Sequence, residues 1–365
     1  MTSKERFWKA VSLQEPDRVP VAPYMLYFAG ALAGMTPAEY GWSVEKSHKA
    51  LYECYTFFHK EIDALSIECM RFAFTDVFPS AYSALYFNWD FPSDGVPQFT
   101  QERCKHGRDL YDRVLEEGFA CLIHPSRILI DEIQKTYSEE TKANQKWMKQ
   151  WSAEDVVDIA GPVATIPIDL LIYARGSEGF IDLLSDQEKL KEINDAMTPG
   201  MIAVSKLQTK MTDGDFQTVS VQNFSGDLVS PKVFEDLCWP WMKRIIEVFL
   251  GDGFAVILHL DGNWTPFYHY FQDLPPGRII LELEFSDMKE AKRVLGETLC
   301  LKGNVPCTDL AFGTASQVKD RCRQLIDDCA SGGGFILSSG CEVPVNAKPE
   351  NIEAMIETAI TYGKY

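Results

Sequence analysis

Short apolar runs alternate with longer helical stretches through the second part of this sequence. The apolar runs, rich in Val, Ile, Leu and Phe, cover 156–160, 218–221, 254–258, 279–283, 298–301 and 334–337. Segments of helical period separate them, at 187–210, 231–250, 287–295, 315–330 and 349–362. A repeated strand–helix–strand order implies right-handed parallel crossovers, so that helices cover a parallel sheet. The four units after residue 215 predict the second half of a TIM (β/α)8 barrel. A doubly wound open sheet is the alternative.

The beginning of the chain predicts helical additions to that barrel. Residues 2–14 form an amphipathic pattern that opens with the capping box Thr2-x-x-Glu5. A helical stretch from 36 to about 62, broken near Gly41, precedes a short strand at 64–67. The pattern therefore places helices before the first clear strand.

A long aromatic segment, 75–106, interrupts this part of the chain and predicts an ordered loop or cap. Because barrels often exceed ~250 residues, we expect one barrel domain over residues 1–365. Residues 1–150 would supply the N-terminal helices, the first strand and the cap. Residues 151–365 would supply the remaining βα units.

Charge and cysteine content exclude several classes of protein. A net charge of -18 argues against nucleic acid or an anionic membrane surface as a partner. No apolar run approaches the ~18 residues that a membrane span needs, and the charged N-terminus does not read as a signal peptide. The ten cysteines show no CxxC pair, which is typical of reduced thiols. We therefore expect a cytoplasmic protein.

Two predicted strands end in residues that could bind a metal. The strand at 254–258 runs into His259-x-Asp261, and the strand at 334–337 is followed by Cys341. Side chains two apart on a strand point the same way, so His259 and Asp261 could hold one ion together. Zinc accepts His, Asp and Cys ligands and can leave a position open for a substrate. The alternative is a hydrogen-bonded structural histidine and a cysteine that packs as a small apolar residue.

Several motifs, spread over nearly the whole chain, resemble those of the uroporphyrinogen decarboxylase superfamily, and above all its branch of cobalamin-dependent methyltransferases. They are Glu15-Pro-Asp-Arg-Val-Pro-Val21, Gly161-Pro162, Ala174-Arg-Gly-Ser-Glu-Gly-Phe180, Val229-Ser-Pro231, Lys302-Gly-Asn304, Gly313-Thr314 and Leu337-Ser-Ser-Gly-Cys-Glu-Val-Pro344. The resemblance implies a single TIM barrel with N-terminal helices. The decarboxylases carry an arginine-bearing segment for substrate carboxylates, but 21–30 contains no Arg. We therefore set porphyrinogen decarboxylation aside, because a tetracarboxylate would lack cationic partners.

The resemblance implies a zinc site with one departure from the family pattern. The thiol-methylating branch carries His-x-Cys and a distant Cys as ligands, which match this chain at His259 and Cys341 but not at Asp261. A carboxylate leaves zinc a harder Lewis acid than a thiolate does, which favours an oxygen leaving group over a thiol nucleophile. Asp261 and Glu282 are the candidate catalytic residues, and Glu282 or Glu284 could supply a fourth ligand. Loss of zinc binding is the alternative.

Six further residues are candidates for binding the substrate. Tyr24, Tyr27 and Trp264 could form an aromatic wall, or could pack in the core or a lid. Asn223, Asn263 and Asn304 lie at or beyond strand ends, where they could bind the substrate or the corrinoid, or close turns.

The function we expect is O-demethylation by a zinc-dependent methyltransferase, which moves a methyl group from a small methylated donor to cobalt. The chain contains no Asp-x-His-x-x-Gly motif for cobalamin, so the corrinoid should arrive on a partner protein. One alternative is methyl transfer from methylcobalamin to a thiol or folate. Others are a decarboxylase-like lyase and a metal-free binding homologue.

Overall fold

The computed structural model describes residues 1–41, 43–67, 106–118, 142–212 and 214–365. Its strands are β1 (Ala64–Leu65), β2 (Val157–Asp158), β3 (Val163–Ala164), β4 (Phe216–Ser220), β5 (Ala255–Leu260), β6 (Ile279–Leu283), β7 (Cys300–Val305) and β8 (Phe335–Ser339). Its helices are α1 (Ser3–Val11), α2 (Leu26–Leu32), α3 (Pro37–Gly41), α4 (Val44–Phe57), α6 (Leu110–Glu117), α8 (Pro167–Arg175), α9 (Ser177–Ser185), α10 (Gln187–Thr212), α11 (Pro231–Leu237), α12 (Trp239–Gly251), α13 (Tyr268–Phe271), α14 (Met288–Leu295), α15 (Cys307–Phe312), α16 (Ala315–Cys329) and α17 (Pro349–Thr361). The aromatic cap expected at 75–106 lies almost entirely outside the described residues.

The strands close into a parallel barrel. Strands β3 to β8 pair in chain order, and β1 pairs with β2. β2 and β3 lie in one extended segment, which pairs with β1 at its start and with β4 at its end. The ring closes through an extended segment near Val21, because Ala22 N donates to Leu337 O of β8 and Asp63 N donates to Val21 O. This closure confirms the TIM barrel and excludes the open doubly wound sheet.

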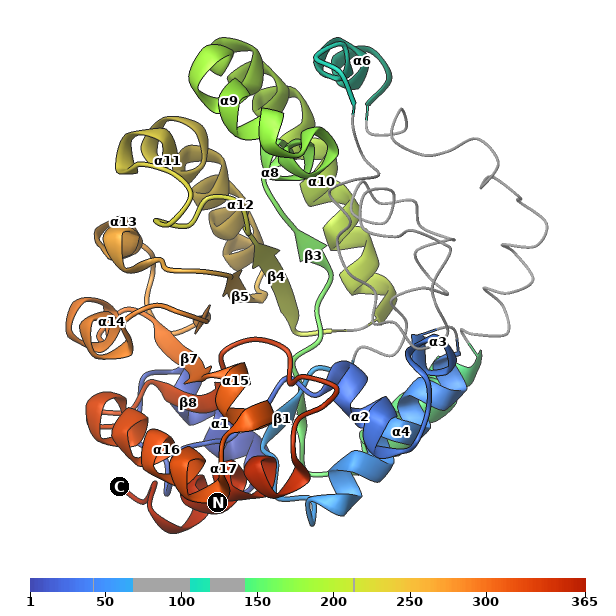
Figure 1. Ribbon diagram of the computed structural model, residues 1–365, viewed down its shortest axis with the longest axis vertical. Coiled ribbons are helices and arrows are strands. Elements are labelled where there is room, and N and C mark those ends of the chain that lie inside the picture. The colour runs from blue at the N-terminus through green and yellow to red at the C-terminus, as the bar shows by residue number, and fades with distance from the viewer. Residues whose placement is uncertain (42, 68–105, 119–141, 213) are drawn as a thin grey trace.

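Helices form a layer outside the strands, as Figure 1 shows for α8 to α14, α16 and α17. The larger apolar core lies between this layer and the barrel. A second core fills the barrel itself with alternate strand residues such as Ile257, Ile280 and Ile336. Phe7 of α1 joins that second core, and Trp8 stacks on Phe216 at the start of β4, with ring centroids 5.2 Å apart. Helix α1 therefore covers the amino-terminal end of the barrel, and the carboxyl ends of the strands are left for a site.

Most strand boundaries differ by one or more residues from those that the sequence predicts, and two elements show the physical reasons or the extent of the change. The single helix expected at 231–250 is two helices, because the chain turns at Cys238 and Pro240 stands in the first turn of α12. The strand expected at 298–301 is β7, which begins at Cys300 and continues to Val305. Within the described part of the chain, no helix is long and apolar enough to span a membrane.

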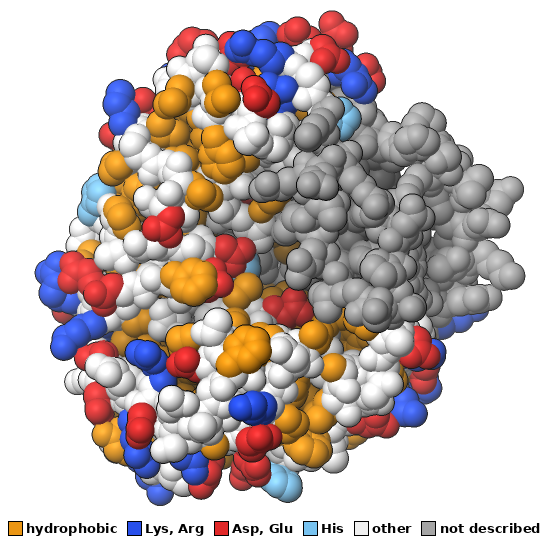
Figure 2. All heavy atoms as spheres, in the orientation of Figure 1, with side chains coloured by type: hydrophobic (Ala, Val, Ile, Leu, Met, Phe, Trp, Pro, Cys, Tyr) orange, Lys and Arg blue, Asp and Glu red, His pale blue; other side chains and the backbone are white. Residues whose placement is uncertain are grey.

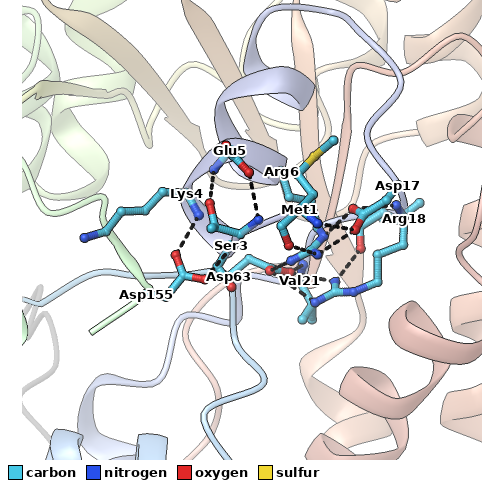
Figure 3. Close-up of polar contacts among 12 residues, drawn as sticks. Met1, Ser3, Lys4, Glu5, Arg6, Asp17, Arg18, Val21, Asp63 and Asp155 are labelled. Carbon is cyan, nitrogen blue, oxygen red and sulfur yellow. Dashed lines mark hydrogen bonds and ion pairs between the residues drawn. The ribbon is translucent and has the colours of Figure 1, made fainter. Parts of the chain in front are cut away.

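A buried ion-pair network fixes the segment before Val21 to the barrel (Figure 3). The side chain of Asp63 is fully buried and accepts hydrogen bonds from Arg6 Nη1 and Arg18 Nη1, each 2.7 Å long, and from Val21 N at 2.8 Å. Arg6 also makes a bidentate pair with Asp17 through Nε and Nη2, at 2.6 and 2.8 Å. The motif Glu15-Pro-Asp-Arg-Val-Pro20 thus stabilises the end of the barrel that lies opposite the site.

Replacing Asp63 by Asn is expected to lower the free energy of unfolding by about 3 kcal/mol, because the buried Arg6 and the partly buried Arg18 lose their shared anion. Chemical denaturation measures this. Asp155→Asn is the control, since Asp155 is exposed and accepts hydrogen bonds from the backbone N–H groups of Ser3 and Lys4. This change should lower the free energy of unfolding by about 1 kcal/mol or less. Equal losses in the two variants would contradict a special role for Asp63.

The contribution of Asp17 should depend on pH. The hydrogen bonds and charge of Arg6 lower the pKa of Asp17 to about 2, against a smaller opposing effect of burial. Its stabilisation is therefore present above pH ~4 and is lost as the pH falls toward 2. Because the side chain is 42% exposed, we expect Asp17→Asn to cost only about 1 kcal/mol at pH 7. Denaturation of both proteins at pH 6 and pH 3 should show this difference shrinking; a constant difference would contradict the account.

Candidate metal centre

The three predicted metal ligands meet at the carboxyl end of the barrel. His259 lies in β5, Asp261 follows that strand directly, and Cys341 lies two residues beyond β8. Side chains two residues apart on a strand point to the same side, so Ile257, His259 and Asp261 share one side of the chain. Ile257 belongs to the core inside the barrel. The polar pair therefore stands above the apolar filling of the barrel. His259, Asp261 and Cys341 form the metal-competent cluster among the residues that the structure describes.

The donor atoms of this cluster lie at distances that fit one zinc ion. His259 Nε2 is 3.3 Å from Asp261 Oδ1, and Cys341 Sγ is 3.6 Å from the same oxygen. One donor atom from each residue lies within 4.8 Å of the others. Tetrahedral zinc with bonds of about 2.0 to 2.3 Å separates its ligand atoms by roughly 3.3 to 3.7 Å. A histidine nitrogen, a carboxylate oxygen and a sulfur are also ligand types that zinc binds.

The electrostatics of the cluster favour a positive charge between its members. Burial alone would lower the pKa of His259, but Asp261, Cys341 and Glu282 outweigh that effect and raise it well above its ordinary value. Burial would raise the pKa of Asp261, yet the charge of His259 lowers it. Burial raises the pKa of the Cys341 thiol. A proton on His259 or a divalent cation can supply the charge that this arrangement stabilises.

The second ring nitrogen of His259 contacts the buried ion pair of Glu282 and Lys302. Its Nδ1 lies 3.1 Å from Glu282 Oε2, and Lys302 Nζ donates to Glu282 Oε1. Metal-binding histidines commonly donate their second ring N–H to a carboxylate, which fixes the tautomer and the ring orientation. Glu282 therefore lies on the Nδ1 side of the imidazole, whereas Asp261 lies on the Nε2 side. Its roles as a fourth ligand and as a catalytic residue stay predictions.

Glu284, the other candidate for a fourth ligand, supports the loop after Asp261. Its Oε2 accepts a hydrogen bond of 3.1 Å from Gly262 N, and burial raises its pKa. Gly262 has φ +84°, and a Cβ there would lie 2.8 Å from Ser225 Oγ, so the loop requires glycine at this position. In Figure 2, acidic side chains lie in the middle of the face shown.

The aromatic candidates divide into one beside the cluster and two in the core. The Tyr24 ring lies 6.2 Å from the His259 ring, edge to face. Tyr27 is 3% exposed and packs on Tyr40. Trp264 is fully buried, and its Nε1 donates a hydrogen bond of 2.8 Å to Asp261 O. The burial of Tyr27 and Trp264 corresponds to the core-packing alternative, and a role of the three aromatic residues in binding a substrate stays a prediction.

The three asparagines bind backbone or buried groups. Asn223 N donates to Oδ1 of the buried Asp169, at 2.9 Å. Asn263 Oδ1 accepts from Thr265 N, as in a turn. Asn304 Nδ2 donates to Glu284 O and Ser286 O and so fixes the loop that follows β6. The Asn263 contact corresponds to the turn-closing alternative, whereas Asn223 and Asn304 bond residues of other segments. A role of the three side chains in binding a substrate stays a prediction.

Sequence reasoning missed Lys302, which is 1% exposed in the centre of β7. The strand pattern could have indicated that Lys302 points into the barrel, because residues 300, 302 and 304 share one face of β7. Cys300 of that face lies in the core inside the barrel. A lysine at such a position needs a buried anion. Register pairing supplies it, since Lys302 lies opposite Glu282 and Glu282 lies opposite His259.

Comparisons with known proteins agree with this fold. The sequence model of the family described as Uroporphyrinogen decarboxylase (URO-D) matches residues 152–362, more than half of the chain. The methylcobamide:CoM methyltransferase MtbA of Methanosarcina mazei is 23% identical over 199 residues, which are 54% of this chain and 56% of that protein. A uroporphyrinogen decarboxylase of Pseudoalteromonas translucida is 21% identical over 161 residues, 40% of this chain and 43% of that protein. The chain thus spans about half the length of these curated relatives.

A solved structure matches over a greater length. A methyltransferase from Methanosarcina mazei superposes with a TM-score of 0.70 over 99% of both chains, at 17% sequence identity. At that identity the likeness shows the fold.

Proposed function

This chain belongs to the uroporphyrinogen decarboxylase family, and on that premise we propose that it is a zinc-dependent methyltransferase. It transfers a methyl group from a small methylated donor to the cobalt of a corrinoid carried by a separate protein. The observation that carries the proposal is the cluster of His259 Nε2, Asp261 Oδ1 and Cys341 Sγ at the catalytic end of the barrel. The similarity to MtbA supports a corrinoid partner.

The residues of the cluster have distinct tasks in this proposal. His259, Asp261 and Cys341 would hold the metal, and three protein ligands would leave a fourth position for the substrate, as in catalytic zinc sites. Glu282 is a positioning residue that orients His259, and Trp264 Nε1 holds the backbone carbonyl of Asp261. A zinc ion bound here supplies a Lewis acid that stabilises an oxygen leaving group.

The charge of the site favours a donor without negative charge. Asp261, Glu282 and Glu284 lie at the carboxyl ends of two adjacent strands, and the buried cation Lys302 is already paired with Glu282. An anionic methyl donor would be repelled by these carboxylates, because Lys302 is already paired with Glu282 and cannot offset its charge. A neutral methyl ether or a related small methylated compound meets no such cost. The cytoplasmic location and the single-domain organisation stay predictions beside this proposal.

Two other functions remain as alternatives with specific support. The similarity to MtbA supports methyl transfer from a methylcobamide to a thiol, whereas Asp261 in place of a second thiolate favours demethylation. Decarboxylation has support from decarboxylase relatives, but segment 21–30 contains no arginine to hold substrate carboxylates.

The test of the proposed function is a methyl-transfer assay. The zinc-loaded protein is incubated with cob(I)alamin and, one at a time, small methyl ethers, methylamines and methyl thioethers. Our proposal predicts that the absorption of cobalt(I) is replaced by that of methylcobalt(III) with at least one ether, because the harder zinc site favours oxygen leaving groups. Conversion with thioethers alone would instead support the thiol alternative.

A further inference from the structure

His259, Glu282 and Lys302 form a row of charged or ionisable side chains across three adjacent strands. In the register of the sheet, His259 of β5 lies opposite Glu282 of β6, which lies opposite Lys302 of β7. Register partners in parallel strands point to the same face, here the inside of the barrel. Their side chains are 15%, 7% and 1% exposed. The row lies directly above the apolar residues Ile280 and Cys300, which fill the barrel below it.

The ion pair in this row is costly to bury. Lys302 Nζ contacts Glu282 Oε1, and the second carboxylate oxygen is 3.1 Å from His259 Nδ1. A buried ion pair adds little net stability, and replacing such a pair with apolar residues of similar volume is often neutral or stabilising. Stability alone therefore does not account for a lysine at this depth.

The pair has a specific consequence for the neighbouring metal ligands. Glu282 is a carboxylate close to three donor atoms that suit zinc, and a carboxylate is itself a good zinc ligand. Lys302 and His259 Nδ1 together occupy both of its oxygens. A Glu282 side chain released from Lys302 would have the metal as its nearest strong cation.

We propose that Lys302 is a positioning residue that holds Glu282 behind His259, and so keeps one coordination position of the metal open for substrate. The proposal rests on the metal site of the proposed function. The Lys302–Glu282 pair then limits the protein ligands of the metal to three. A fourth protein ligand would close the site, as in structural zinc centres.

The test replaces the zinc by Co²⁺, whose visible absorption reports the number of its ligands, and titrates the protein with azide. Wild-type protein should show a new absorption band as azide enters the open position. Lys302→Met should still bind Co²⁺, but its azide affinity should fall at least about tenfold, because Glu282 competes as an intramolecular ligand. Glu282→Gln in the same chain as Lys302→Met should restore azide binding, since a neutral amide is a poor zinc-type ligand. A merely structural role for Lys302 predicts no such rescue.

Lys302→Gln is the second variant, because a glutamine still offers Glu282 a hydrogen-bond donor if Lys302→Met fails to fold. Its loss of azide affinity should be smaller than that of Lys302→Met, because a neutral amide holds the carboxylate less strongly than an ammonium group does. If folded Lys302 variants bind azide as the wild type does, the proposal is overturned while the metal site stands. If wild-type protein binds no Co²⁺, the proposed function fails, and this proposal fails with it.

Discussion

Replacing Cys341 by Ser is expected to reduce the affinity for zinc by about a thousandfold or more, and His259→Ala should do the same. Each change removes one of three protein ligands, whereas changes of outer hydrogen-bond partners typically cost 10- to 100-fold. The measurement is a competition titration with a chelator of known affinity.

Cys307→Ser is the matched control for this prediction. Cys307 is another half-buried cysteine nearby, and its Sγ donates to Glu342 O at 3.3 Å instead of facing Asp261. The control should keep wild-type zinc affinity, which shows that loss in Cys341→Ser comes from the ligand and not from removal of a thiol. Unchanged zinc affinity in Cys341→Ser would contradict the assignment of the ligands.

The second large effect concerns the direction of methyl transfer. Asp261→Cys recreates the His-x-Cys and distant Cys arrangement of the thiol-methylating branch that the sequence resembles. Zinc should still bind, because its filled d shell imposes no preference among these ligands. A second thiolate lowers the Lewis acidity of the ion, so demethylation of an ether should fall about a hundredfold. Methylation of an added thiol by methylcobalamin should rise.

Both reactions can be measured on one preparation of Asp261→Cys, with its zinc content as the control for folding and metal loading. If the variant keeps zinc and loses no demethylation activity, ligand hardness does not set the direction of transfer. The preference for demethylation over thiol methylation would then have no physical support.

The parts of the site that the sequence predicts are those fixed by strand periodicity. His259 and Asp261 share a face because they are two residues apart, and Cys341 follows another strand at the same end of the barrel. Strand β6 has the predicted bounds because Arg278 and Glu284 flank the run Ile279-Ile-Leu-Glu-Leu283, in which Glu282 is the one polar residue.

The parts that the sequence does not predict depend on contacts between distant residues. Lys302 looks like the end of an apolar run, and only the pairing of β7 with β6 shows the carboxylate that neutralises it. The pairing of Arg6 with Asp63 joins residues 57 positions apart. The sequence leaves open whether Trp264 lines the site or packs in the core, and its edge-to-face contacts with Phe234 and Phe267 place it in the core.

The central claim is that His259, Asp261 and Cys341 hold one zinc ion with an open position. X-ray absorption at the zinc edge of the wild-type protein tests it most directly. We predict about one zinc per chain, with one sulfur at about 2.3 Å and nitrogen or oxygen neighbours at about 2.0 to 2.2 Å. In Cys341→Ser the sulfur neighbour should be lost. Folded protein that takes up no zinc, or zinc with no sulfur neighbour or several, would contradict the account.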